Sequence, residues 1–275
     1  DEKFGEVTFS YEQVYNGTTS SGLATSCTAS RTAWYQDTRS WTTRDALVNK
    51  YRIGGITAWT LGMEEPLAME AIRSVAKEIA PDQVNVVASV DADEIQYGKA
   101  ISVSAQFSIK DKSPVANLPV RIEGKSASDT SWRTLSSAVT DTEGRISKSL
   151  LLAKSTSIRI YSESSWERTE GISSEMPVEI LRDLFVDAPT SVKSGSTFEI
   201  TGSVKPRNTA AAIRVEKLSG KKWEPLSADV TTDTQGNFLL KVNGQSRGVF
   251  TFRVTALEDT NWKVVTSPTF NIIVR

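Results

Sequence analysis

The segment TDTEGRI at residues 140–146 returns as TDTQGNF at residues 232–238, 92 positions further along the chain. In each copy the Asp side chain can accept hydrogen bonds from backbone N–H groups of a turn, and the Gly supplies a positive φ. A polar and then an apolar residue follow the Gly, which is the alternation of a half-buried strand. The repeated segment therefore predicts a tight turn that leads into a β-strand, at two places in the chain.

Further matching segments extend this repeat in both directions. YGKAISV at 97–103 matches SGSTFEI at 194–200, WRTL at 132–135 matches WEPL at 223–226, and IRI at 158–160 matches FRV at 252–254. The offsets, between 91 and 97 residues, have the length of one immunoglobulin-like (Ig-like) domain. Beyond Pro81 the chain is rich in Ser, Thr, Val and Ile, with turn residues about every ten positions. We therefore predict a mainly β fold with two tandem Ig-like β-sandwiches, at residues 82–181 and 182–275.

The N-terminal residues 1–81 have a different pattern. Short β-prone stretches at 32–35 and 56–61 alternate with helical apolar spacing at 41–51 and from Pro66 to Ile79. Ser40 is the predicted N-cap of the first helix, and the two glycines at 54–55 are its predicted end. Strand, helix, strand and helix joined by short connections predict parallel strands covered by helices, in an incomplete α/β segment.

This segment resembles the carboxyl end of family 18 glycoside hydrolases. The resemblance lies in WYQDTRS at 34–40, KY at 50–51, GIxxWxLG at 55–62 and Glu64, and it covers about residues 1–80. The most similar branch is bacterial and includes chitinases together with spore-germination and cell-wall hydrolases. The resemblance implies that residues 1–81 are the last two β/α units of a TIM barrel, whose active site lies at the C-terminal ends of its strands.

The resemblance also implies a set of substrate-binding residues. Trp59 matches the tryptophan that forms the floor of the subsite for the scissile sugar, and Asp37 matches an acidic residue that lines the cleft. Tyr35 and Glu64 belong to the same motifs and are further candidates. The pattern alone, without the resemblance, favours Trp59 in a barrel core and Asp37 capping a helix or pairing with Arg39.

The catalytic signature of that family, DxxDxDxE, does not occur in this sequence. It supplies the general acid of a mechanism in which the substrate's own N-acetyl group is the nucleophile. DADE at 91–94 lacks the first Asp and the spacing to the Glu, and we interpret it as a solvated strand edge. Because a whole barrel needs about 250 residues, we expect a C-terminal fragment, inactive by itself, of a secreted hydrolase of chitin or peptidoglycan.

The alternative is a non-catalytic cell-surface protein, in which tandem Ig-like domains bind glycan or act as spacers. The two sandwiches resemble modules of secreted bacterial surface proteins that have such roles. Trp132 and Trp223 occupy equivalent positions in the two copies and could either pack into the sandwiches or contact glycan. Asp141 and Asp233 have no second group of carboxylates nearby, so turn formation accounts for them without calcium.

Composition limits the remaining classes of function. The 32 basic and 33 acidic residues give a net charge of −1 without a basic stripe, which argues against a nucleic-acid partner. The absence of His removes the usual metal ligand and the base of catalytic triads, so we expect no metal and no cofactor. No apolar run is long enough to span a membrane.

We expect an extracellular or cell-surface location and a polysaccharide or cell-wall partner. The oligomeric state stays open, as does the state of Cys27, either unpaired in a loop or bonded to a cysteine outside this sequence.

Overall fold

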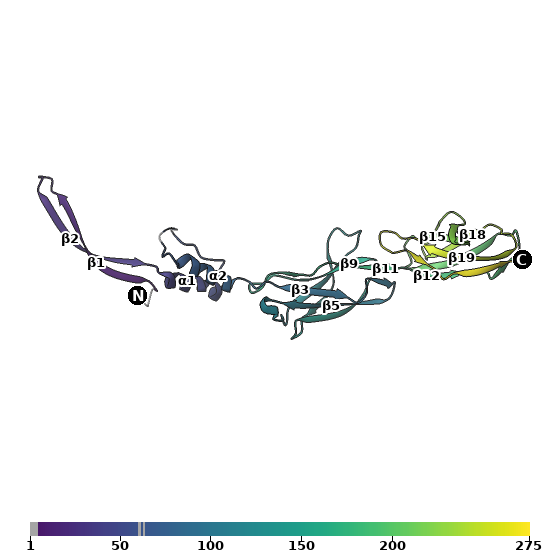
Figure 1. The fold of residues 1–275 in the computed structure, drawn as a ribbon, viewed down its shortest axis with the longest axis horizontal. Coiled ribbons are helices and arrows are strands. Elements are labelled where there is room, and N and C mark those ends of the chain that lie inside the picture. The colour runs from purple at the N-terminus through teal and green to yellow at the C-terminus, as the bar shows by residue number, and fades with distance from the viewer. Residues whose placement is uncertain (1–4, 60–61, 63) are drawn as a thin grey trace. The chain divides into compact units, whose positions relative to one another are not determined.

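The computed structural model describes residues 5–59, 62 and 64–275, which separate into two compact units. One unit comprises the chain up to Asp82 together with Ser165–Glu167, and the other comprises residues 83–164 and 168–275. Strands predominate in the larger unit and over the described chain as a whole, so the predicted mainly β class is confirmed (Figure 1).

The larger unit contains two β-sandwiches that share one strand plan. In the first, the smaller sheet has the order β3-β5-β8, with strands β3 (Asn85–Val90), β5 (Ala100–Ser108) and β8 (Arg145–Leu151). The larger sheet has the order β4-β11-β9-β6-β7, with strands β4 (Glu94–Gln96), β11 (Met176–Leu181), β9 (Thr156–Ser162), β6 (Pro119–Lys125) and β7 (Arg133–Val139), and with β10 (Gly171–Ile172) paired to β9. A 3-10 turn, η1 (Lys110–Lys112), follows β5. All pairs are antiparallel except that of β11 with β4.

The second sandwich repeats this plan. Its smaller sheet has the order β12-β14-β18, with strands β12 (Asp183–Asp187), β14 (Phe198–Lys205) and β18 (Asn237–Val242). Its larger sheet has the order β13-β21-β19-β15-β16, with strands β13 (Ser191–Val192), β21 (Phe270–Val274), β19 (Gly248–Ala256), β15 (Ala212–Ser219) and β16 (Lys222–Pro225), and with β17 (Val230–Thr231) on β15 and β20 (Val265–Thr266) on β19. The parallel pair β13–β21 matches β4–β11. Two Ig-like sandwiches are therefore present, as the repeat predicts.

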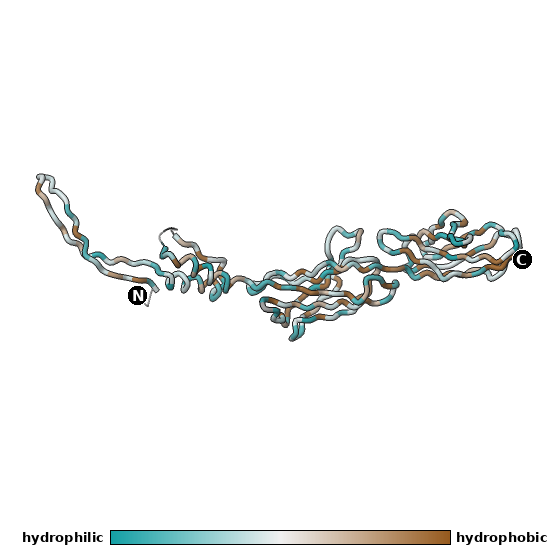
Figure 2. Tube along the Cα trace, viewed as in Figure 1, coloured by the Kyte–Doolittle hydropathy of each residue, from teal (hydrophilic) through white to brown (hydrophobic). Residues whose placement is uncertain are grey.

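Each sandwich has its own hydrophobic core, built by alternation along its strands. In β5, Ile101, Val103, Ala105 and Phe107 point inward and are buried, while the residues that alternate with them are exposed. In the second sandwich Ile200 and Leu240 face each other across β14 and β18 in the same way. The tube in Figure 2 shows this alternation of hydrophobic and hydrophilic residues along the strands of the sandwiches. Burial of each such side chain larger than Ala stabilises the fold by about 1.5–3 kcal/mol.

The two predicted turns form as their sequences indicate. The Asp141 carboxylate accepts hydrogen bonds from the N–H groups of Glu143 and Arg145, at 2.9 and 2.8 Å. Asp233 holds the equivalent turn of the second sandwich in the same way, and both turns continue into strands. Gly144 has a φ of +71°, and a Cβ at this position would overlap the backbone oxygen of Phe107. Glycine is therefore required here by conformation and by space together.

The N-terminal unit differs from the predicted α/β segment. β1 (Val7–Thr18) and β2 (Ala24–Tyr35) form one antiparallel hairpin, followed by α1 (Thr38–Tyr51) and α2 (Ala68–Ile79). The predicted parallel strands are thus wrong. Residues 56–59 form no strand, and residues 60 and 61 of that prediction lie outside the described part of the chain. The tight turn at Thr19–Leu23 brings β2 back onto β1, where local antiparallel pairing satisfies the backbone groups of both strands.

Three local predictions in this unit also need correction. Asp37, not Ser40, is the N-cap of α1, and Arg52 in the left-handed conformation is its C-cap, before the predicted glycines. Residues 32–35 do belong to a strand, β2, but Trp34 and Tyr35 are half exposed rather than buried. Cys27 lies exposed in β2 as a free thiol, not in a loop.

The N-terminal unit has almost no hydrophobic core of its own. Among its described residues Ala68 is the one buried hydrophobic residue. Large hydrophobic side chains are instead exposed: Phe9, Tyr11, Val14, Tyr15, Leu23, Trp34, Tyr35, Leu47, Tyr51, Ile53, Ile56, Trp59 and Leu67. A single hairpin is only marginally stable in water, so this unit gains little stability from burial compared with either sandwich.

The contrast between Gly144 and Gly98 gives a test of the turn. Both have positive φ, but a Cβ on Gly98 would meet no atom. We expect Gly98→Ala to destabilise the first sandwich by about 1–2 kcal/mol, the cost of the left-handed conformation. Gly144→Ala should cost about 2–5 kcal/mol because steric overlap is added. Urea unfolding of both variants measures the difference, and equal losses would contradict the close packing at Gly144.

Candidate functional site

A hollow of about 880 Å³ in the N-terminal unit brings together three of the four predicted substrate-binding residues, Tyr35, Trp59 and Glu64. The other residues that line it are Trp34, Gln36, Trp41, Arg44, Leu47, Ile53, Ile56 and Thr57. The Trp59 side chain is 95% exposed, which excludes a place in a core. The hollow thus offers several aromatic surfaces close together, although no barrel surrounds it.

Asp37 is the predicted residue that does not line the hollow. Its Oδ1 accepts hydrogen bonds from the backbone N–H of Ser40 at 2.8 Å and from the Ser40 hydroxyl at 2.7 Å. The Ser40 backbone N–H, followed by the Ser40 hydroxyl, lowers the pKa of the Asp37 carboxyl. The carboxylate therefore stabilises the start of α1, and the alternative interpretation of Asp37 as a helix cap is confirmed.

Two polar residues that line the hollow, Arg44 and Glu64, bond to residues outside its lining. Arg44 forms an ion pair with Glu6 at 2.9 Å, and Glu64 accepts a hydrogen bond from the Gly62 backbone at 2.5 Å. Gln36 Oε1 and Trp41 Nε1 are buried without a hydrogen-bond partner. Flat aromatic faces beside an unpaired acceptor and an unpaired donor can bind a ligand that has both an apolar face and hydroxyl groups.

Trp132 lies against an arginine on the larger sheet of the first sandwich. The guanidinium carbon of Arg159 is 4.3 Å from the centre of the Trp132 ring, and Arg159 forms an ion pair with Glu123 at 2.9 Å. Trp132 is half-buried, and Glu123 is almost fully buried. Cation–π contact and the ion pair thus fix the three side chains together on the sheet.

The second sandwich contains the same cluster. Arg253 lies 4.4 Å above the Trp223 ring and pairs with Glu216 at 2.7 Å. The hydrogen bond from Arg253 is the main cause that lowers the pKa of the Glu216 carboxyl. One face of each tryptophan is covered by its arginine, so neither is a core residue or a fully free aromatic surface. The glutamates were missed from the sequence, although their separation of 93 residues, from 123 to 216, follows the repeat.

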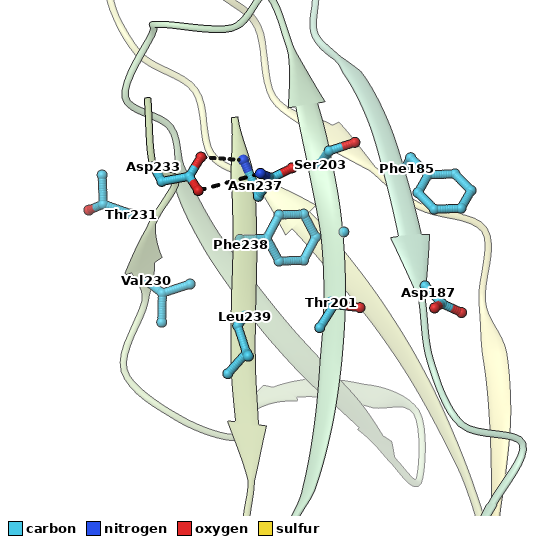
Figure 3. A pocket seen from close by; sticks show the side chains of 11 residues that line it. Phe185, Asp187, Thr201, Ser203, Val230, Thr231, Asp233, Asn237, Phe238 and Leu239 are labelled. Atoms are coloured by element: carbon cyan, nitrogen blue, oxygen red, sulfur yellow. Dashed lines mark hydrogen bonds between the residues drawn. The ribbon is translucent and has the colours of Figure 1, made fainter. Parts of the chain in front are cut away.

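A further hollow of about 680 Å³ lies against the β12-β14-β18 sheet and is lined by residues of all three strands (Figure 3). Phe185 and Leu239 are its exposed hydrophobic residues. Asp233 at its rim is held by Asn237 and belongs to the turn described above.

The described residues contain no group of three or more His, Cys, Asp or Glu side chains placed to bind a metal ion. Within the same residues, neither helix has the length and apolar character required to cross a membrane.

Comparisons with known proteins return structural neighbours only. No family model matches the sequence, and no curated protein matches it. The adhesin InvE of Yersinia pseudotuberculosis is 14% identical with a TM-score of 0.37, over 69% of this chain and 58% of that one. A 282-residue C-terminal fragment of intimin, solved with the intimin-binding domain of its translocated receptor, is 15% identical with a TM-score of 0.33, over 67% of this chain and 62% of that one. Red sea bream transglutaminase is 12% identical with a TM-score of 0.36, over 77% of this chain and 34% of that one. Scores below 0.5 do not establish a common overall fold, so the Ig-like assignment rests on the strand order and registers of the two sandwiches.

Protonation of Glu216 should weaken the second sandwich. A carboxyl whose pKa is lower in the folded state contributes stability that is fully present above its unfolded pKa, about 4.3, and is lost as the pH falls towards the folded value. We expect Glu216→Gln to reduce the melting temperature at pH 7 and to lose less further stability than the wild type between pH 7 and pH 3. Exposed Glu224 provides the control as Glu224→Gln. Parallel pH profiles for wild type and Glu216→Gln would contradict the role of the ion pair.

Proposed function

We propose that this chain is a non-catalytic, extracellular or cell-surface module in which the tandem Ig-like sandwiches act as a stiff spacer. The observation that carries the proposal is the junction between them. β11 ends at Leu181 and β12 begins at Asp183, so Arg182 is the single residue that links the two sandwiches. A linker of one residue leaves few backbone dihedral angles about which the sandwiches can turn.

Arg182 itself is fully buried and bonded to the second sandwich. Its guanidinium donates to the Thr209 hydroxyl at 2.8 Å and to the Ala210 carbonyl at 3.2 Å. It pairs with Asp259 at 2.5 Å and stacks on Trp262, with its central carbon 4.2 Å from the ring centre. A buried guanidinium is strongly destabilising unless it is paired and hydrogen-bonded in this manner.

The β19–β20 loop of the second sandwich also contacts the first sandwich. Trp262 packs against the core of the first sandwich. The Lys263 backbone N–H donates to the Ile180 carbonyl at 2.9 Å, and the Lys263 ammonium pairs with Glu179 at 2.8 Å. The Ser155 backbone N–H donates to the Asn261 backbone carbonyl at 2.8 Å. Apolar, ionic and backbone contacts thus combine with the short linker to resist bending between the sandwiches.

The hydrolase interpretation receives less support. The parallel strands that would belong to a barrel are replaced by a hairpin, and the sequence contains no DxxDxDxE run. A second candidate function, contact with a polysaccharide such as chitin or peptidoglycan, is favoured by one specific observation: Trp59 is almost fully exposed beside a hollow with other aromatic residues. This function would add to the spacer role and needs no catalytic acid.

The spacer proposal is tested by distances between the sandwiches. Spin labels on Ser149→Cys and Lys241→Cys, in a Cys27→Ser background, place one exposed probe on each sandwich. We expect a narrow distance distribution in the otherwise unchanged chain, and a broad one after Arg182→Ala, because Asp259 and Trp262 lose their partner. Arg207→Ala, which removes an exposed arginine, is the control. A broad distribution before any substitution at Arg182 would overturn the proposal.

Polysaccharide contact is tested by retention on insoluble chitin and on peptidoglycan. Trp59→Ala should reduce retention by about tenfold, equivalent to 1.4 kcal/mol of binding free energy. Tyr51→Ala, which removes an exposed aromatic residue outside the hollow, should leave retention unchanged. Trp132→Ala and Trp223→Ala measure any contribution of the sandwich clusters. Equal retention of wild type and Trp59→Ala would remove Trp59 as a contact residue.

A further inference from the structure

A second cavity in the N-terminal unit, of about 340 Å³, lies beside the two helices. Its walls are almost entirely apolar and consist of Val48, Ile53, Gly54, Gly55, Ile56, Ile72, Ala76, Ile79, Ala80, Pro81 and Trp166. The only charged residue among those that line it is Asp45, in α1. The volume falls within the range of pockets that bind small ligands.

The Asp45 side chain is unusual in being buried without a partner. The residue is 4% exposed, and its Oδ2 has no hydrogen-bond partner. Burial raises the pKa of this carboxyl. Every other buried charged residue in the described chain has an ionic partner: Glu123 pairs with Arg159, and Arg182 pairs with Asp259. An unpaired buried carboxyl is costly, and in a native structure it calls for a specific explanation.

The neighbouring cations do not supply this partner. No Lys or Arg lines the cavity. Arg44, the residue before Asp45, bonds to Glu6 and to the Ser40 carbonyl. The cavity therefore combines a hydrophobic interior with one lining carboxyl group, one oxygen of which has no hydrogen-bond partner.

We propose that this cavity binds an organic ammonium group, with its alkyl or aryl body against the apolar walls and its N–H donating to Asp45 Oδ2. The ligand would supply the missing positive charge, and hydrogen bonds between ions are stronger than neutral ones in surroundings of low polarity. Ile72 and Ile79 of α2 and Trp166 would contact the apolar part of the ligand. A free amine and a lysine side chain of another protein share this chemistry.

The test uses the 275-residue chain and titration calorimetry with four probes: benzylamine, butylamine, N-acetyl-lysine methylamide and benzyl alcohol. We expect the ammonium probes to bind and the neutral alcohol to bind at least about tenfold more weakly, which corresponds to 1.4 kcal/mol. Binding of the lysine derivative without benzylamine would identify a partner's side chain as the source, whereas the reverse would identify a free amine. Both results support the proposed chemistry.

Asp45→Asn keeps the shape of the side chain and removes its charge. This variant should lose at least about tenfold in affinity for benzylamine while its own melting temperature stays equal or rises, because an unpaired buried charge is removed. Glu78→Gln, an exposed change in α2, should bind as the wild type does. Binding of benzyl alcohol as tight as that of the best ammonium probe would overturn the proposal, and so would the absence of binding of all three ammonium probes to the wild type up to about 10 mM. The comparison of the ammonium probes with the alcohol decides the question even if Asp45→Asn does not fold.

Discussion

The buried guanidinium of Arg182 is the constraint on which the arrangement of the two sandwiches depends. It lies in a linker of one residue, and its bonds all go to the second sandwich. The aromatic ring on which it stacks, that of Trp262, packs in turn against the core of the first sandwich. The Arg182 side chain therefore bonds to the second sandwich and, through Trp262 of the β19–β20 loop, is linked to the core of the first sandwich. Removing it would leave Asp259 without its ionic partner at the same place where the chain could bend.

The repeat preserves more than the fold of a single sandwich. Each copy has an Asp-held turn, a glycine in the left-handed conformation and a Trp–Arg–Glu cluster on the larger sheet. The clusters use polar and aromatic groups to fix the outer surface of a sheet, where burial contributes less. The cation–π contact and the ion pair hold the three side chains of each cluster against one another. This agrees with a spacer role for the sandwiches.

The N-terminal unit differs from the sandwiches in how little of its hydrophobic surface is buried. Its hairpin and helices expose large hydrophobic side chains, and its two hollows contain three buried polar atoms that lack a hydrogen-bond partner, Gln36 Oε1, Trp41 Nε1 and Asp45 Oδ2. Three more such atoms among the described residues, Arg182 Nε, Asn261 Oδ1 and Trp262 Nε1, lie at the junction of the sandwiches. The three atoms in the hollows lie in a unit with a small core, where a bound ligand can satisfy them. Structural support comes mainly from the sandwiches, and the candidate binding sites lie mainly in the N-terminal unit.

The sequence by itself determined the two sandwiches, because alternation along strands and the Thr-Asp-x-x-Gly turns are local patterns that recur at a constant spacing. It also placed Tyr35, Trp59 and Glu64 in one group of candidate substrate-binding residues, and these three line one hollow, while their binding role stays a prediction. The partner of a strand is not encoded locally, so β2 was assigned to a parallel sheet although it pairs with β1. Likewise, Asp37 as a cap, Arg182 as a junction and Asp45 as an unpaired carboxyl depend on neighbours distant in sequence or on local backbone geometry. Only the tertiary structure decided these roles, since burial and the presence of a partner are properties of the folded chain.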